Sequence, residues 1–295
     1  PLLAAMATVT SRVQLGTGVL LAPLHDPVRI AEDAAVVDLV SHGRLVLGVG
    51  LGWRAEEFEV LDVPLADRVP RLRALVATCR AAWNGEPTRR SNGIDGGHGF
   101  GYVTPRPYRA GGPPIWIGAL SEPALRRAGA IADGVMATEV TPDELAAAVA
   151  LARSGAADAG RDPDALTVAL HLPTLVTDAA TRWPQVRDVL HYPGWKYDDM
   201  DEAHGSVGPL RPPGPLTGDA DRRLRETSLT GTPEQVAERI QAYAAAAGGD
   251  LHFVARSYLP GQDRARRLAA LEGLAEVRAL LAAPAGLTQV AESVI

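Results

Sequence analysis

Short runs of uninterrupted apolar residues alternate with longer, capped helical segments along most of this chain. The runs span about five to eight residues, the usual length of strands, and are apolar on both faces. Such strands are typical of parallel sheets that crossover helices cover on each side. Strands of this kind are predicted within residues 13–21, 45–49, 113–120, 134–138, 165–176 and 250–261.

The helix signals are equally regular. Asp26 and Pro27 are typical of an N-cap and a first helical residue, and Gly43 marks the end of that helix. Capping boxes are predicted from Thr141 with Glu144, and from Thr232 with Gln235. Each capped segment follows or precedes an apolar strand, so we expect an α/β fold.

About six strands can be identified, whereas a closed (β/α)8 barrel requires eight. Either the sheet is open, or the first strands of a barrel precede residue 1. A chain of 295 residues is the right size for one barrel domain spanning residues 1–295. Residues 177–229 do not follow the alternation of strand and helix signals, and they contain prolines and aromatic residues. We expect them to form a long insertion that acts as a lid or pocket wall.

Composition excludes several classes of protein. The formal net charge of −6 argues against nucleic acid as the main partner. No apolar run is long enough to cross a bilayer, so we expect no membrane association. The single cysteine, Cys79, excludes an internal disulfide and fits a reducing cytoplasm. The 7 histidines are dispersed, and no metal site is predicted.

The stretch RLVLGVGLGWRAEEF (44–58) places Gly48, Gly50 and Gly52 at the end of an apolar strand. A dinucleotide site would need G-x-G-x-x-G opening directly into a helix, whereas bulky Trp53 follows here. The glycines could instead admit close packing within the chain, or let backbone approach a flat ring. The sequence alone leaves these readings open.

Several ordered motifs decide between them by resemblance. Residues 11–58, RLRALVATCRAAWNG (71–85), GYVTPRPYRAGGPPIWIGALSEPALRRAGAIADG (101–134) and GTPEQVAERI (231–240) resemble the bacterial-luciferase-like superfamily of flavin- and deazaflavin-dependent oxidoreductases. The resemblance implies a TIM-type barrel with the cofactor ring at the carboxyl ends of its strands. It also implies that two strands and a helix precede residue 1.

The resemblance places the cofactor on two groups of residues. It implies a non-prolyl cis peptide at Gly18-Val19, with Gly50, Leu51 and Gly52 beside the ring. Gly118, Ala119, Leu120 and Ser121 lie where a strand passes into a helix. Free N–H groups at such an N-terminus favour an anion, so we expect the cofactor phosphate there. Ser121 could alternatively serve only as the N-cap.

Candidate catalytic and substrate-binding residues come from the ends of strands and from the insertion. His25 could donate a proton, or could lie at the surface, and Glu57 could bond ring-edge groups or form a solvated salt bridge. Some related deazaflavin enzymes carry a catalytic glutamate after the glycines, where this chain has Trp53; this departure argues against the sugar-phosphate dehydrogenase branch. The predicted substrate-binding residues are Trp53, His171, Trp195 and Arg256.

The predicted activity is two-electron oxidation or reduction of a small organic substrate. The cofactor is coenzyme F420, which we favour on the arginine-rich composition, or FMN. F420 implies hydride transfer, and FMN with oxygen implies monooxygenation. We expect a homodimer, as in relatives. The alternative is a non-catalytic barrel that binds flavin or serves a structural role.

Overall fold

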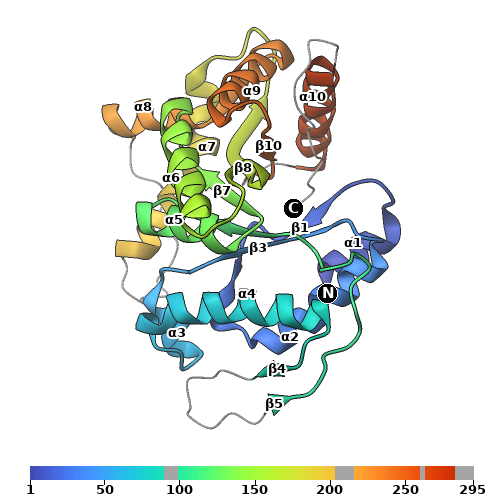
Figure 1. Ribbon diagram of the computed structural model, residues 1–295. Coiled ribbons are helices and arrows are strands. Elements are labelled where there is room, and N and C mark those ends of the chain that lie inside the picture. The colour runs from blue at the N-terminus through green and yellow to red at the C-terminus, as the bar shows by residue number, and fades with distance from the viewer. Residues whose placement is uncertain (90–98, 203–215, 260–262, 283–295) are drawn as a thin grey trace. The chain divides into compact units, whose positions relative to one another are not determined.

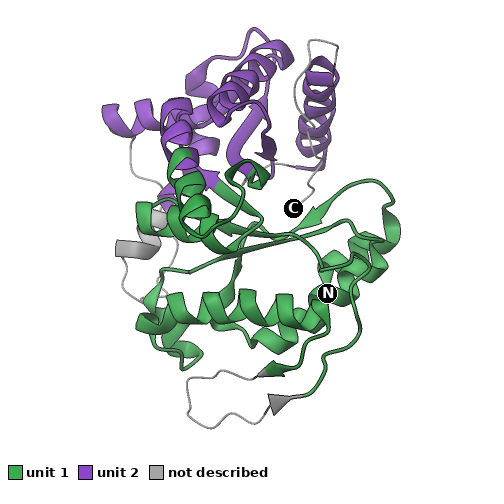
Figure 2. Ribbon diagram, viewed as in Figure 1, with its two compact units in different colours: residues 1–136, 150–167, 291–295 green, residues 137–149, 168–290 purple. Residues whose placement is uncertain are grey.

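The computed structural model describes residues 1–89, 99–202, 216–259 and 263–282. Figure 2 shows two compact units within the chain. The first contains residues 1–136 and 150–167, and the second contains residues 137–149 and the described part of 168–290. Strand β7 (Gly134–Thr138) and helix α6 (Pro142–Asp158) each begin in one unit and end in the other.

The first unit is built on a parallel sheet, as the apolar runs predict. Its strands follow the order β1 (Leu15–Gly16), β3 (Leu45–Gly50), β6 (Ile115–Gly118) and β7, and β2 (Leu20–Leu21) also pairs with β3. Every residue of β3 is buried. Because β2, β3 and β6 run in the same direction, their carboxyl ends lie at one edge of the sheet.

The helices of the first unit begin and end where their capping residues predict. The Asp26 carboxylate accepts hydrogen bonds from the N–H groups of Val28 and Arg29 and so starts α2 (Pro27–Val40). Gly43, with φ +79°, follows its end. Helix α2 packs against α4 (Arg68–Asn84), as Figure 1 shows, and Cys79 is buried within α4.

Shorter elements complete this unit. They are α1 (Leu2–Val9), η1 (Ala22–Leu24), α3 (Ala55–Val60), η2 (Leu65–Asp67), α5 (Glu122–Ile131), η3 (Pro163–Ala165) and the antiparallel pair β4 (Thr88–Arg89) and β5 (Gly99–Phe100). The pair β4–β5 is not among the predicted strands, because two residues per strand give no readable apolar pattern.

The second unit also has parallel strands. Strand β8 (Thr167–Val176) pairs with β9 (Leu229–Gly231) and with β10 (His252–Arg256). Helix α9 (Pro233–Ala247) starts with the predicted capping box of Thr232 and Gln235, and α10 (Arg264–Ala282) packs against it. Their apolar faces cover β8 and β10, with Leu170, Leu172 and Tyr243 almost fully buried.

The described part of residues 177–229 contains two helices that the sequence does not predict. They are α7 (Trp183–Glu202) and α8 (Gly218–Thr227), while 203–215 lie outside the described residues. Val186 and Leu190 of α7 are buried against Leu259, and the indole N–H of Trp183 donates to Asp221 at 2.9 Å. Pro193 within α7 masks its helical period, which explains why the sequence does not predict it.

Candidate cofactor site

The carboxyl ends of β3 and β6 are lined by glycines that pack directly against residues 17–19. A Cβ atom on Gly48 would overlap the carbonyl oxygen of Thr17, whose hydroxyl donates to the Gly48 carbonyl at 2.6 Å. A Cβ on Gly50 would lie 2.5 Å from Cγ2 of Val19, and one on Gly118 would lie 3.3 Å from its Cγ1. The close approach at Gly48 and Gly50 is therefore to the chain itself.

The peptide bond between Gly18 and Val19 is cis, as the resemblance implies. It lies between β1 and β2, and Leu21 of β2 is in register with Gly50. Gly18 and Gly50 therefore lie at the same end of the parallel strands. Val19 extends from this segment over the glycines and fills the space that side chains would otherwise occupy.

Gly52 has a different reason to be glycine. Its φ of +70° lies in the left-handed region, and an added Cβ would lie 3.1 Å from the ring of Phe58. Helix α3 then begins only at Ala55 and has 6 residues, so no long helix opens from the glycines. A dinucleotide fingerprint would require one. Leu51 beside Gly52 is half-buried.

The N-terminus of α5 is open in the way that an anion site requires. Ser121 is its N-cap, but the hydroxyl makes no capping hydrogen bond. The N–H of Ala119 donates to Met136 within the sheet at 3.2 Å. Within the described residues, the backbone N–H groups of Leu120, Ser121 and Glu122 donate to no other group, and all three residues are exposed. These groups, rather than the N–H of Ala119, are available to an anion.

The two predicted catalytic residues both lie in the first unit. His25 follows η1 and is exposed; partial desolvation lowers the pKa of its imidazole, while Asp33 opposes this shift. Glu57 lies in α3, and within the described residues its carboxylate has no ion pair, whereas the neighbouring Glu56 pairs with Arg54 at 3.3 Å. Trp53, between β3 and α3, is 43% exposed.

The second unit brings His171 and Arg256 together. His171 on β8 is in register with Val254 of β10, and Arg256 is opposite Pro173. Burial, together with the positive charge of Arg256, lowers the pKa of His171 to about 4. His171 is therefore neutral at neutral pH. Trp195 on α7 stacks at a tilt on Tyr192, with 5.2 Å between ring centroids.

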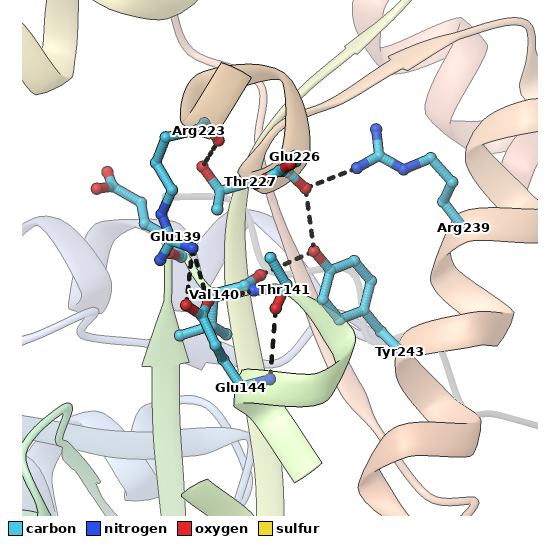
Figure 3. A network of polar contacts seen from close by, with 9 residues as sticks. All are labelled: Glu139, Val140, Thr141, Glu144, Arg223, Glu226, Thr227, Arg239 and Tyr243. Atoms are coloured by element: carbon cyan, nitrogen blue, oxygen red, sulfur yellow. Dashed lines mark hydrogen bonds and ion pairs between the residues drawn. The ribbon is translucent and has the colours of Figure 1, made fainter. Parts of the chain in front are cut away.

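A polar network at the end of β7, drawn in Figure 3, includes Glu139, which the sequence did not indicate as a site residue. Glu139 follows β7 with φ +54°, a conformation uncommon for a side-chain-bearing residue. Arg223 donates to the Glu139 carbonyl at 2.7 Å and contacts both carboxylate oxygens of Glu144 at 2.8 Å. The Tyr243 hydroxyl donates to the next carbonyl, that of Val140, at 2.8 Å.

This network fixes the backbone and leaves the Glu139 carboxylate exposed at the carboxyl end of a parallel strand. In barrel enzymes, catalytic groups come from such strand ends. Glu139 therefore joins the candidates. Its only sequence signal is an acidic residue directly after a short apolar strand.

Metal-binding clusters and membrane-spanning helices are both absent from the part of the chain that the structure describes. No group of three or more histidine, cysteine, aspartate or glutamate residues there could hold a metal ion. None of the described helices combines the length and the apolar character that crossing a membrane requires.

Comparison with known proteins identifies the family. The sequence model of the luciferase-like monooxygenase family matches residues 1–250. The chain therefore belongs to the luciferase-like monooxygenase family, whose members are oxidoreductases, as its motifs indicate.

A curated relative is the phthiodiolone/phenolphthiodiolone dimycocerosates ketoreductase of Mycobacterium tuberculosis. It is 37% identical over 200 residues, which cover 67% of this chain and 48% of that protein. The chain thus spans about half the length of this relative.

Two solved structures establish the fold class, a TIM-type barrel fold of the luciferase-like kind. An F420-dependent secondary alcohol dehydrogenase, in complex with an F420–acetone adduct, matches with a TM-score of 0.70 and 17% identity, covering 93% of this chain and 82% of that one. The oxygenating constituent of 3,6-diketocamphane monooxygenase from Pseudomonas putida, in complex with FMN, matches with a TM-score of 0.73 and 19% identity, covering 97% and 83%.

The packing of Val19 on Gly50 predicts a rescue between two substitutions. Gly50→Ala should lower the free energy of unfolding by about 1–3 kcal/mol, because the new methyl group meets Val19 Cγ2. Val19→Ala should restore at least half of this loss in the double variant, since it removes the atoms in conflict. Urea unfolding of the four proteins measures the coupling. Strictly additive losses would contradict the packing described.

The lowered pKa of His171 predicts a pH-dependent stability. The folded pKa is about 4 and the unfolded value is about 6.5, so the unfolded chain binds more protons between these values. The free energy of unfolding should therefore fall as pH decreases from 6.5 towards 4, by up to about 3 kcal/mol from this histidine. When unfolding is measured at several pH values, the free energy of unfolding of His171→Gln should fall less steeply with decreasing pH than that of the unsubstituted protein. An imidazole that titrates near 6.5 by NMR would refute the assignment.

Proposed function

We propose that this protein is a two-electron oxidoreductase that uses F420 or FMN to reduce or oxidise a small organic substrate. The observation that carries the proposal is the edge of the sheet in the first unit. There Gly18, Val19 and Gly50 are packed together beside the open N-terminus of α5. A cofactor with a flat ring and a phosphate-bearing side chain could bind at a surface of this kind.

The residues present fit the phosphate of such a cofactor. The unused Ser121 hydroxyl and the N–H groups of Leu120, Ser121 and Glu122 supply several donors at the positive end of a helix of 10 residues. Glu122 is the one nearby carboxylate on α5, and Arg126 holds it in an ion pair at 2.9 Å. Pro123 fixes the first turn without adding a competing donor.

The bound cofactor would supply hydride exchange, or oxygen activation if it is FMN. The chain must then orient the substrate and move a proton at its reacting oxygen. His25 is suited to this task, because its lowered pKa leaves the imidazole neutral near pH 7, able to accept or donate. We propose Glu57 as the second such group. Gly52 and Leu51 would border the ring, and Trp53 would contact the substrate.

In the second unit, we propose substrate roles for three residues. Neutral His171 can form a hydrogen bond to a carbonyl or hydroxyl group, and the Arg256 guanidinium can hold a negative charge. Trp195 offers an apolar face.

We favour F420 over FMN. The name of the mycobacterial relative denotes reduction of a ketone, which is a hydride transfer. The alcohol dehydrogenase of similar fold carries an adduct of F420 with acetone, a small ketone. The FMN-bound monooxygenase has an equally similar fold, so FMN is the second candidate. A homodimer in the cytoplasm fits this proposal. A barrel that binds flavin without catalysis is the alternative.

Substitution of Ser121 tests the phosphate site. Ser121→Ala should weaken cofactor binding by about 1.5–3 kcal/mol, which corresponds to about 10- to 150-fold in Kd. Titration of the purified protein with F420 and with FMN, followed by absorbance, gives the affinities and also shows which cofactor binds. Thr8→Ala is a control at an exposed hydroxyl on α1. Unchanged affinity in Ser121→Ala would contradict the proposed site, and binding without turnover of carbonyl compounds would favour the non-catalytic alternative.

A further inference from the structure

Three arginines of the first unit lie together without an acidic partner. Arg68 and Arg73 belong to α4, and Arg127 belongs to α5. Within the described residues, none of these three side chains makes an ion pair or a hydrogen bond. Three other arginines of this unit are paired: Arg80 with Asp133 at 2.9 Å, Arg109 with Asp38 at 3.2 Å and Arg126 with Glu122 at 2.9 Å, whereas Arg153 also has a buried Nε atom without a hydrogen-bond partner. In a chain with more acidic than basic residues, 35 against 29, this grouping needs a reason.

Arg127 shows that the group is incomplete. Its Nε atom is buried and has no hydrogen-bond partner. Burial lowers the pKa of its guanidinium, and the positive charges of Arg73 and Arg68 add to this shift. Buried donors are nearly always paired, and three guanidinium groups repel one another. An oxyanion among them would accept the orphaned N–H and offset the repulsion.

The position of the group follows from two anchors on α4. Arg71 Nε donates to the Pro23 carbonyl at 2.6 Å, which holds the first turns of α4 against η1, directly after β2. Arg80 Nη2 donates to the Ile131 carbonyl at 3.1 Å, so a later turn of α4 lies beside the end of α5. The two helices therefore run in the same direction. Arg68 and Arg73 lie in the N-terminal half of α4, and Arg127 lies just past the middle of α5.

This is the end of the unit that carries the open N-terminus of α5. Arg127 follows Ser121 by six residues, which is about 9 Å along a helix. Its side chain also leans back towards the N-terminus, as helical side chains do. A ligand whose phosphate lies at Ser121 could reach the three arginines with an extension of a few atoms.

We propose that Arg68, Arg73 and Arg127 form a subsite for a multiply charged oxyanion, phosphate or carboxylate. This inference rests on the proposed function, because the ligand is taken to be the anionic end of the cofactor, beyond its first phosphate. The guanidinium planes suit either group, since both accept paired N–H donors. FMN ends at one phosphate, whereas F420 continues into carboxylates. The subsite therefore favours F420.

The direct test uses anions alone. Inorganic pyrophosphate and citrate should raise the melting temperature of the protein above that in sodium chloride of equal ionic strength. Their Kd should rise about tenfold in Arg127→Gln and at least threefold in Arg73→Gln. Arg12→Gln, which removes an exposed arginine that precedes β1, should change the Kd by less than twofold. Because Arg73 is exposed, its variant tests the subsite even if Arg127→Gln folds poorly. Absence of anion binding, or an equal loss of affinity in Arg12→Gln, would overturn the proposal.

Cofactor titrations identify the source of the anion. Arg73→Gln and Arg127→Gln should raise the Kd of F420 about tenfold. They should change the Kd of FMN, and that of F420 without its glutamate residues, by less than twofold. If the variants lose pyrophosphate but bind all three cofactors normally, the anion is not part of the cofactor, and this assignment is wrong. If the protein binds pyrophosphate at these arginines but no cofactor, the proposed function fails while the oxyanion subsite stands.

Discussion

The contact between residues 17–19 and the glycines of β3 determines how the first unit is arranged. Gly48 leaves room for the Thr17 carbonyl, Gly50 for one methyl group of Val19, and Gly118 on β6 for the other. Protein interiors are packed so closely that a single methyl group at such a point must displace something. The absence of three Cβ atoms therefore brings β2 to the edge of β3, and with it η1 and the first turns of α4.

This arrangement gathers positive electrostatic features at one end of the unit. The parallel direction of β3 and β6 places the N-termini of α4 and α5 beyond the same sheet edge. Helix N-termini attract anions, and the uncapped Ser121 and the unpaired arginines add donors to that attraction. In a chain of net charge −6, this is a local reversal of sign that would draw an anionic ligand to the glycine-lined edge.

Local signals predicted the elements well, because they depend on neighbouring residues. Asp26, Thr141 and Thr232 cap helices through contacts two or three residues away. The resemblance supplied the cis bond at Gly18, which no local rule gives. The sequence could not predict that Gly48 contacts Thr17, because the two residues are 31 positions apart in the chain. The sequence also could not predict the unpartnered Nε of Arg127, which depends on how two helices pack, or the left-handed backbone of Glu139. Gly50 and Gly52 were expected to lie beside a ring; within the chain itself, a Cβ atom on Gly50 would meet Val19 and one on Gly52 would meet Phe58.

Hydrogen–deuterium exchange with and without cofactor tests most directly whether this sheet edge is the binding site. Backbone amides in residues 15–21, 48–52 and 118–125 should become protected when F420 or FMN is added, because a bound ring and phosphate would cover exposed N–H groups and reduce local opening. Helix α1 and the exposed turns of α2 should exchange at unchanged rates. Cofactor binding that leaves these three segments unprotected would contradict the account.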